Sequence, residues 1–240
     1  MQEVAVKSSE VRYVVTFDKE RKGEEKVLVA SDEESLTAFR YMFEDCLVAQ
    51  DFKTQGCLEK HNLENYLKSR ITPSDKQCLL ECLEKIDFSD LSGTKIRLLD
   101  KSQVHKTSQE NVMISEIELP IKTKIDLFLG DVTHTTEINL DHVNQEHIEA
   151  ILLTELCRQA CMVSLNSSLG SDAYYHITEE VKKYKHIVQR GKDILIHTLP
   201  VTGKRNKGIG LCFFTIYQDS KLCLSGYYSV MYLKKGMRHE

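Results

Sequence analysis

The alternation of hydrophobic and polar positions changes near residue 95, and the first part of the chain mixes strand and helix patterns. Short β-rich runs come first, and apolar positions at helical spacing follow them. The expected elements are strands at Val11–Asp18 and Lys26–Ala30 around a hairpin loop at Gly23, a helix with Ser31 as its N-cap, and helices at Leu58–Lys68 and from Thr72 to about Phe88. Gly93 and its small polar neighbours mark a boundary. We therefore predict an α/β segment over residues 1–95.

The remainder, residues 96–240, is dominated by strand patterns on both sides of one long helix at about Glu146–Asn166. The predicted strands are Lys95–Leu99, Val112–Leu119, Lys124–Leu129 and Thr133–Ile138 before the helix, and Tyr174–Lys185, Asp193–Leu199, Gly208–Gln218 and Lys221–Leu233 after it. Asp219-Ser220 between the last two is typical of a tight hairpin turn. This order predicts an α+β domain with a largely antiparallel sheet.

Composition narrows the class of protein. The chain of 240 residues is 41% hydrophobic and 28% charged, which excludes wholesale disorder, and its net charge of −4 gives no basic field for nucleic acid. No apolar run approaches the roughly 18 residues of a membrane span, and the N-terminus lacks a signal-peptide pattern, so we expect a cytoplasmic protein. The eight cysteines contain no CxxC, and we expect them to be small buried hydrophobes. The spacing of the histidines matches no common metal site, so we expect no metal and no bound cofactor.

The long helix carries the candidate chemistry. Plotted at about 100° per residue, it is apolar nearly all round, which predicts a helix enclosed by the sheet. Glu155, Arg158 and Gln159 interrupt this pattern on the face that also carries Ile148 and Met162. A buried carboxylate must be paired or hydrogen-bonded, and both Arg158 and Gln159 lie within reach of Glu155 on a helix. The cluster is therefore either a buried ion pair with a structural role or part of a functional site.

Three stretches resemble the A-factor biosynthesis hotdog domain, typified by AfsA. They are Leu152–Ala160, with its Glu-x-x-Arg-Gln-Ala pattern, the segment from Val104-His105-Lys106-Thr107-Ser108 to Asn111–Ser115, and Asp141-His142-Val143. The resemblance covers residues 100–170 by motif and 170–240 by strand pattern. It implies a hotdog fold, an antiparallel sheet wrapped around a central helix, with residues 1–95 as an N-terminal α/β extension.

The resemblance also implies a chemistry. Hotdog proteins act on acyl thioesters of coenzyme A or of phosphopantetheine on acyl-carrier protein, and this family implies acyl transfer to a hydroxyl, as in the biosynthesis of butyrolactone signals and secondary metabolites. Glu155 would then be the base, with Arg158, Gln159 and His142 beside it. The candidate substrate-binding residues are His105, His134, His147, Lys204 and Arg205. Each of His142 and His147 alone is also compatible with a surface or capping position, and the Lys204–Arg205 turn with a solvated loop rather than a phosphate contact.

Several alternatives stay open from the sequence. The family usually carries two hotdog repeats, whereas this chain has one Glu-x-x-Arg-Gln copy, so we expect a homodimer. The other possibility is that residues 1–95 are a degenerate first repeat. The reaction could instead be that of a hotdog thioesterase or dehydratase. The third alternative is a non-catalytic acyl-binding or scaffold protein, in which residues 1–95 bind a partner.

Overall fold

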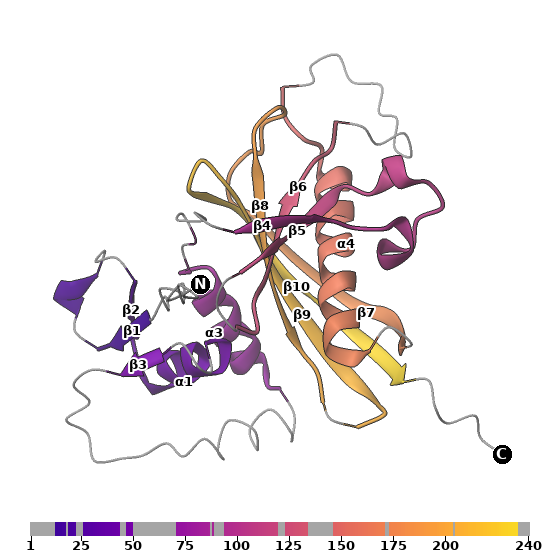
Figure 1. Ribbon diagram of the computed structural model, residues 1–240. Coiled ribbons are helices and arrows are strands. Elements are labelled where there is room, and N and C mark those ends of the chain that lie inside the picture. Colours follow the sequence, from indigo (N-terminus) through magenta and orange to yellow (C-terminus); the bar gives the residue numbers. More distant parts are fainter. Residues whose placement is uncertain are drawn as a thin grey trace, which may run out of the picture.

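The computed structural model describes residues 13–17, 19–22, 26–43, 47–49, 71–86, 88, 94–119, 123–133, 146–170, 173–203 and 205–234. Figure 1 shows a large sheet with one long helix, α4, on one side of it. Two shorter helices, α1 and α3, and a small sheet lie on the other side. The large sheet therefore has two covered faces, which are called here the inner face (toward α4) and the outer face (toward α1 and α3).

The large sheet has seven strands in the order β4-β5-β6-β8-β9-β10-β7, and all its pairings are antiparallel. Its strands are β4 (Lys95–Leu98), β5 (Ile114–Glu118), β6 (Asp126–Gly130), β7 (Ala173–Tyr184), β8 (Ile194–Val201), β9 (Lys207–Gln218) and β10 (Lys221–Lys234). Asp219 and Ser220 join β9 to β10 with positive φ angles of 51° and 57°, as a type I′ hairpin requires. The predicted turn is thus confirmed. The expected strand Thr133–Ile138 lies almost wholly outside the described residues.

Helix α4 (Ala150–Leu169) packs on the inner face, and the sheet with its central helix confirms the predicted α+β hotdog fold. The helix begins four residues later than expected. The reason is that His147 forms a β-bridge with Gln189 and the Ile148 N–H donates to the Val188 carbonyl, so the chain is extended there. Gly170, with φ of 96°, ends the helix.

The N-terminal extension contains β1 (Tyr13–Thr16), β2 (Val27–Val29), α1 (Glu33–Met42), β3 (Leu47–Ala49) and α3 (Pro73–Leu83). The predicted hairpin of the first two strands is wrong, because β2 and β3 both pair parallel to β1. A short 3-10 turn, η1 (Lys19–Arg21), follows β1, and the chain re-enters the sheet with the Lys26 carbonyl accepting from the Val14 N–H, near the start of β1. Gly23 and the predicted helix Leu58–Lys68 lie outside the described residues.

Both N-terminal helices begin at a residue whose side chain caps the helix. Asp32, rather than the expected Ser31, caps α1, because its carboxylate accepts from the Ser35 N–H at 2.7 Å. Thr72 and Asp75 form a complete capping box at the start of α3, as the Thr-Pro-Ser-Asp pattern suggests. Among the described residues, no helix is long and apolar enough to cross a membrane.

The apolar side of the extension shares one core with the outer face of the large sheet. Side chains of α1 and α3, such as Phe39 and Leu83, belong to the same buried cluster as Leu127, Leu199 and Phe213 of β6, β8 and β9. The α4 side forms a second, separate cluster. The large sheet therefore separates two hydrophobic cores. The division of the chain at residue 95 stays a prediction.

Candidate functional site

One stripe of α4 remains partly open to solvent. Ile151 is 51% exposed, and Thr154, Glu155 and Arg158 are half-buried along the same side, whereas Leu152, Leu156 and most other positions are buried. The helix is thus enclosed less completely than its apolar pattern predicted. Two of the three polar residues that interrupt the pattern, Glu155 and Arg158, lie along this open stripe, whereas Gln159 is buried.

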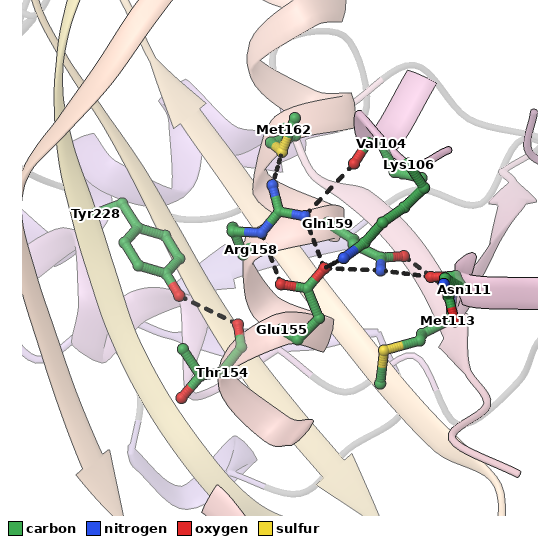
Figure 2. Close-up of polar contacts among 10 residues, drawn as sticks. All are labelled: Val104, Lys106, Asn111, Met113, Thr154, Glu155, Arg158, Gln159, Met162 and Tyr228. Carbon is green, nitrogen blue, oxygen red and sulfur yellow. Dashed lines mark hydrogen bonds and ion pairs between the residues drawn. The ribbon is translucent and has the colours of Figure 1, made fainter. Parts of the chain in front are cut away.

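Glu155 is the centre of an ion-paired cluster on that stripe (Figure 2). Its Oε2 accepts from Arg158 Nε at 2.7 Å, and its Oε1 accepts from Arg158 Nη2 at 2.6 Å and from Gln159 Nε2 at 2.9 Å. The Nζ of Lys106 lies 2.8 Å from the same Oε1. Four donors therefore hold one carboxylate, and they include a two-point contact from arginine, which fixes the orientation of both groups.

Gln159 connects this cluster to the segment before β5. Its amide oxygen accepts from the Met113 N–H at 2.9 Å, and its amide nitrogen donates to the Asn111 carbonyl at 2.9 Å as well as to Glu155. The side chain is fully buried. Because the oxygen has one partner and the nitrogen has two, the position of Glu155 relative to η3 (Gln109–Asn111) is set by hydrogen bonds rather than by packing alone.

The surroundings of Glu155 hold it as a carboxylate. Burial would raise its pKa, but the hydrogen bonds from Arg158, Lys106 and Gln159 and the charge of Arg158 outweigh that effect and lower the pKa to about 2. The side chain of Lys106 is 8% exposed and that of Glu155 is 14% exposed. That of Arg158 is 27% exposed, so its guanidinium is the cation of the cluster that is most open to solvent.

Further groups extend the site along both sides of α4. On one side, Arg158 Nη2 donates to the Val104 carbonyl at 3.4 Å, at the end of η2 (Lys101–Val104), and Nη1 contacts the sulfur of Met162. His105, which follows in the left-handed region at φ of 54°, stacks on Tyr175 of β7 with 6.4 Å between ring centroids. His105 is therefore flanked in the chain by Val104 and Lys106, which both contact the cluster.

On the other side, residues of β7 and β10 reach α4 at Thr154. Tyr228 donates its hydroxyl to the Thr154 carbonyl at 3.3 Å, and Lys182 Nζ donates to the Thr154 hydroxyl. Lys182 also pairs with Glu180 at 2.7 Å. Polar contacts therefore hold the turn of α4 that carries Glu155 to the η2–η3 segment on one side and to β7 and β10 on the other.

The structure brings together only part of the residues singled out from sequence. Glu155, Arg158 and Gln159 meet, and His105 lies beside them. His147 lies before the first turn of α4. Arg205 follows Thr202, whose hydroxyl bonds Ser168 in the last turn of α4. The two ends of α4 are about 30 Å apart, at a rise of 1.5 Å per residue, so the structure does not bring His147 and Arg205 together. His134, His142 and Lys204 lie outside the described residues.

Lys106 is the member of the cluster that the sequence reading did not select as a site residue. It belongs to the Val104-His105-Lys106 stretch that resembles the family, so the motif itself was the available signal. Among the described residues, no group of three or more His, Cys, Asp or Glu side chains could hold a metal ion. The free thiols of Cys82, Cys157, Cys161, Cys212 and Cys223 are buried, as expected, whereas that of Cys78 is half-buried.

Comparison with known proteins agrees with these motifs. Residues 90–180 match the family model described as the A-factor biosynthesis hotdog domain, AfsA. No curated protein matches the sequence. Similar solved structures include a thioesterase from Haemophilus influenzae, with 14% identity and a TM-score of 0.42, covering 67% of this chain and 94% of that one. Another is a sigma28-regulated virulence protein from Campylobacter jejuni, with 12% identity and a TM-score of 0.40, covering 59% and 92%. The family match includes α4 and the η2–η3 segment that together build the Glu155 cluster, so the cluster lies in the part of the chain that is similar to the A-factor biosynthesis hotdog domain.

Proposed function

We propose that this protein binds an acyl thioester of coenzyme A or acyl-carrier protein and transfers the acyl group to a hydroxyl acceptor. The observation that carries the proposal is the Glu155–Arg158–Gln159–Lys106 cluster on the open stripe of α4, inside the segment that matches the A-factor biosynthesis hotdog domain. No cofactor is needed for this reaction, since the thioester is itself the activated acyl donor.

Acyl transfer requires donors that stabilise the oxyanion of the thioester carbonyl and a group that takes the proton of the acceptor hydroxyl. Arg158 supports the first requirement, because it is the most exposed cation of the cluster and Glu155 fixes its orientation. Glu155, with its pKa lowered to about 2, is a weak proton acceptor. Its geometry therefore favours a positioning role for Glu155 over the role of base.

His105 is the described histidine beside the cluster, and we include it in the proposal as the proton acceptor. Its neighbours in the chain, Val104 and Lys106, contact Arg158 and Glu155 directly. An uncharged imidazole has one ring nitrogen that accepts a proton, which suits this role. His142 remains a second candidate from the sequence.

The test is turnover of an acyl-CoA, such as 3-oxooctanoyl-CoA, with glycerol or dihydroxyacetone phosphate as acceptor. Because the chain contains eight cysteines, release of coenzyme A is followed by chromatography rather than by a thiol reagent. Arg158→Gln should lower kcat/KM by about 10²-fold or more, the scale of losing one oxyanion donor. The control is Lys76→Gln, which removes an exposed partner of Glu179 on the outer face. Absence of turnover, or equal activity of Arg158→Gln and wild type, would contradict the proposal.

A second candidate function is a non-catalytic acyl-binding protein. The saturation of Glu155 by four donors favours it, since a carboxylate so held acts as a structural element as well as a positioning one. Saturable binding of acyl-CoA without release of coenzyme A would support this candidate. Release of free acid without an acylated acceptor would instead support a thioesterase.

We further propose that two copies of the chain associate through the β7 side of the sheet. β7 is an edge of the large sheet, is twelve residues long, and carries the exposed apolar side chains Tyr174, Ile177 and Tyr184. A long edge strand with apolar side chains is a ready site for pairing with another chain. Analytical ultracentrifugation should give a dimer, and Ile177→Lys should shift it toward monomer. A wild-type monomer at high concentration would contradict this.

A further inference from the structure

Three polar side chains form a row across the outer face of the large sheet. His197 of β8 lies directly opposite Thr215 of β9, and Thr215 lies directly opposite Ser225 of β10. All three are at most 1% exposed. Neither ring nitrogen of His197, nor either hydroxyl, has a hydrogen-bond partner within the part of the chain that the structure describes. A buried polar atom without a partner destabilises the folded state, so a run of three calls for an explanation.

The imidazole of His197 is held between aromatic rings. Tyr217 stacks on it at 4.9 Å between centroids, and Phe88 meets it edge-on at 5.3 Å. Burial lowers the pKa of His197 to about 3, so the ring is neutral near pH 7. A neutral imidazole has one nitrogen that donates and one that accepts. The ring can therefore hydrogen-bond an uncharged group such as a hydroxyl or an amide.

A cavity of about 650 Å³ adjoins His197. Its apolar lining comes from both sides of the outer core, and it consists of Ile86, Phe88, Leu129, Leu195 and Tyr217. Lys192 and Asp219, which also line it, pair with each other at 2.6 Å. This volume is within the usual range for small-molecule sites, and the combination of apolar walls with a few polar groups is typical of them.

We propose that this cavity is a second binding site, which takes a small uncharged amphipathic molecule with an apolar body and a hydroxyl or amide group bonded to His197. An uncharged ligand fits because the walls beside His197 are apolar, Lys192 and Asp219 pair with each other, and Asp193, the third charged residue of the lining, is exposed to solvent. A charged ligand would lose its hydration without gaining a counter-ion. The site lies on the opposite face of the sheet from Glu155, so it does not depend on the proposed acyl transfer.

The test compares three six-carbon probes, 1-hexanol, hexanoate and hexylammonium, on the full chain labelled with ¹⁵N-histidine. We expect 1-hexanol alone to shift the ring nitrogen signals of His197, which the spectrum of His197→Phe identifies among the nine histidines. His197→Phe keeps the aromatic contacts and removes both nitrogens, and it should weaken the binding of 1-hexanol about tenfold. Lys76→Gln, at a residue outside the cavity lining that pairs with Glu179, is the control and should leave the affinity unchanged.

A second variant tests the cavity without touching the imidazole. Leu195→Phe adds volume to the cavity lining two residues before His197 on β8 and should also weaken binding, while the His197 signals persist in the free protein. The proposal is overturned if 1-hexanol leaves the His197 signals unmoved. It is also overturned if the charged probes bind as tightly as 1-hexanol, or if both His197→Phe and Leu195→Phe bind it as wild type does.

Discussion

The two faces of the large sheet treat buried polar groups in opposite ways. On the inner face, fully buried Gln159 makes three hydrogen bonds, and Ser164 bonds Thr198 across from α4 to β8. On the outer face, equally buried His197 and Thr215 make none within the described residues. A fully satisfied network rigidifies a site, whereas unsatisfied groups cost stability. The inner face thus has the properties of a preorganised site, whereas the outer face buries polar groups that have no partner among the described residues.

The same contrast appears in the pKa values. Burial alone lowers the pKa of His197 to about 3, since nothing stabilises its charged form. Around Glu155, burial acts against the charged form too, but the donors of Arg158, Lys106 and Gln159 override it and lower the pKa to about 2. The inner face therefore stabilises the charge of the partly buried Glu155 carboxylate, whereas the outer face keeps the fully buried His197 ring uncharged.

The largest effect on this comparison should come from Glu155→Gln. The change leaves Lys106 and Arg158 without their carboxylate, and Lys106 is almost fully buried. We expect the free energy of unfolding to fall by about 3 kcal/mol, the scale of breaking a buried ion pair. Urea denaturation measures it, with Glu179→Gln as the control because its pair with Lys76 is exposed and should contribute less than about 1 kcal/mol. Equal losses in the two variants would remove the contrast between buried and exposed pairs.

The next largest effect should be a loss of folding stability at acid pH that depends on His197. Between about pH 6.5 and 3 the unfolded chain binds a proton at this ring and the folded chain does not, so stability is lost as the pH falls through that window. At pH 5 the loss relative to pH 7 is about 2 kcal/mol. His197→Phe should lack this part of the acid sensitivity, measured as the difference in unfolding free energy between the two pH values. An unchanged pH dependence in the variant would mean that the ring is protonated in the folded state.

Gln159→Leu tests whether the hydrogen bonds of the inner face contribute as the geometry implies. Leucine has a similar size but leaves the Met113 N–H and the Asn111 carbonyl without the partner they have now. The expected loss is about 2 kcal/mol, because buried groups stripped of one partner keep their desolvation cost. Chemical denaturation checks it, and a neutral result would place these backbone groups in contact with water.

The smallest effects are expected from the same substitution, threonine to valine, made once on each face of the sheet. Thr198 and Thr215 are both fully buried, on neighbouring strands, but Thr198 bonds Ser164 whereas Thr215 has no partner among the described residues. Thr198→Val should destabilise the protein by about 1 kcal/mol, and Thr215→Val should stabilise it by about as much. Thermal unfolding of the two variants side by side measures the signs. Destabilisation by both would show that the Thr215 hydroxyl has an unseen partner, such as ordered water.

Much of the hotdog domain was readable from local pattern. The alternating strands, the long apolar helix and the Asp219-Ser220 turn depend on short-range preferences, so their positions in the chain predict them. Local sequence pattern predicts the N-terminal extension less well. The direction in which β2 joins β1 depends on how the chain returns between them, and the sequence of the connection does not encode that path.

The sequence by itself determined that Glu155, Arg158 and Gln159 lie on one face of a helix, because helical spacing alone places them there. Only the tertiary structure decided that Lys106, some fifty residues earlier, completes the cluster and that the cluster lies on an open stripe of α4. Only the tertiary structure likewise brings His197, Thr215 and Ser225 into one row, because the three residues come from three different strands. Cross-strand register and the choice of covered face are long-range outcomes of packing, and no local pattern contains them.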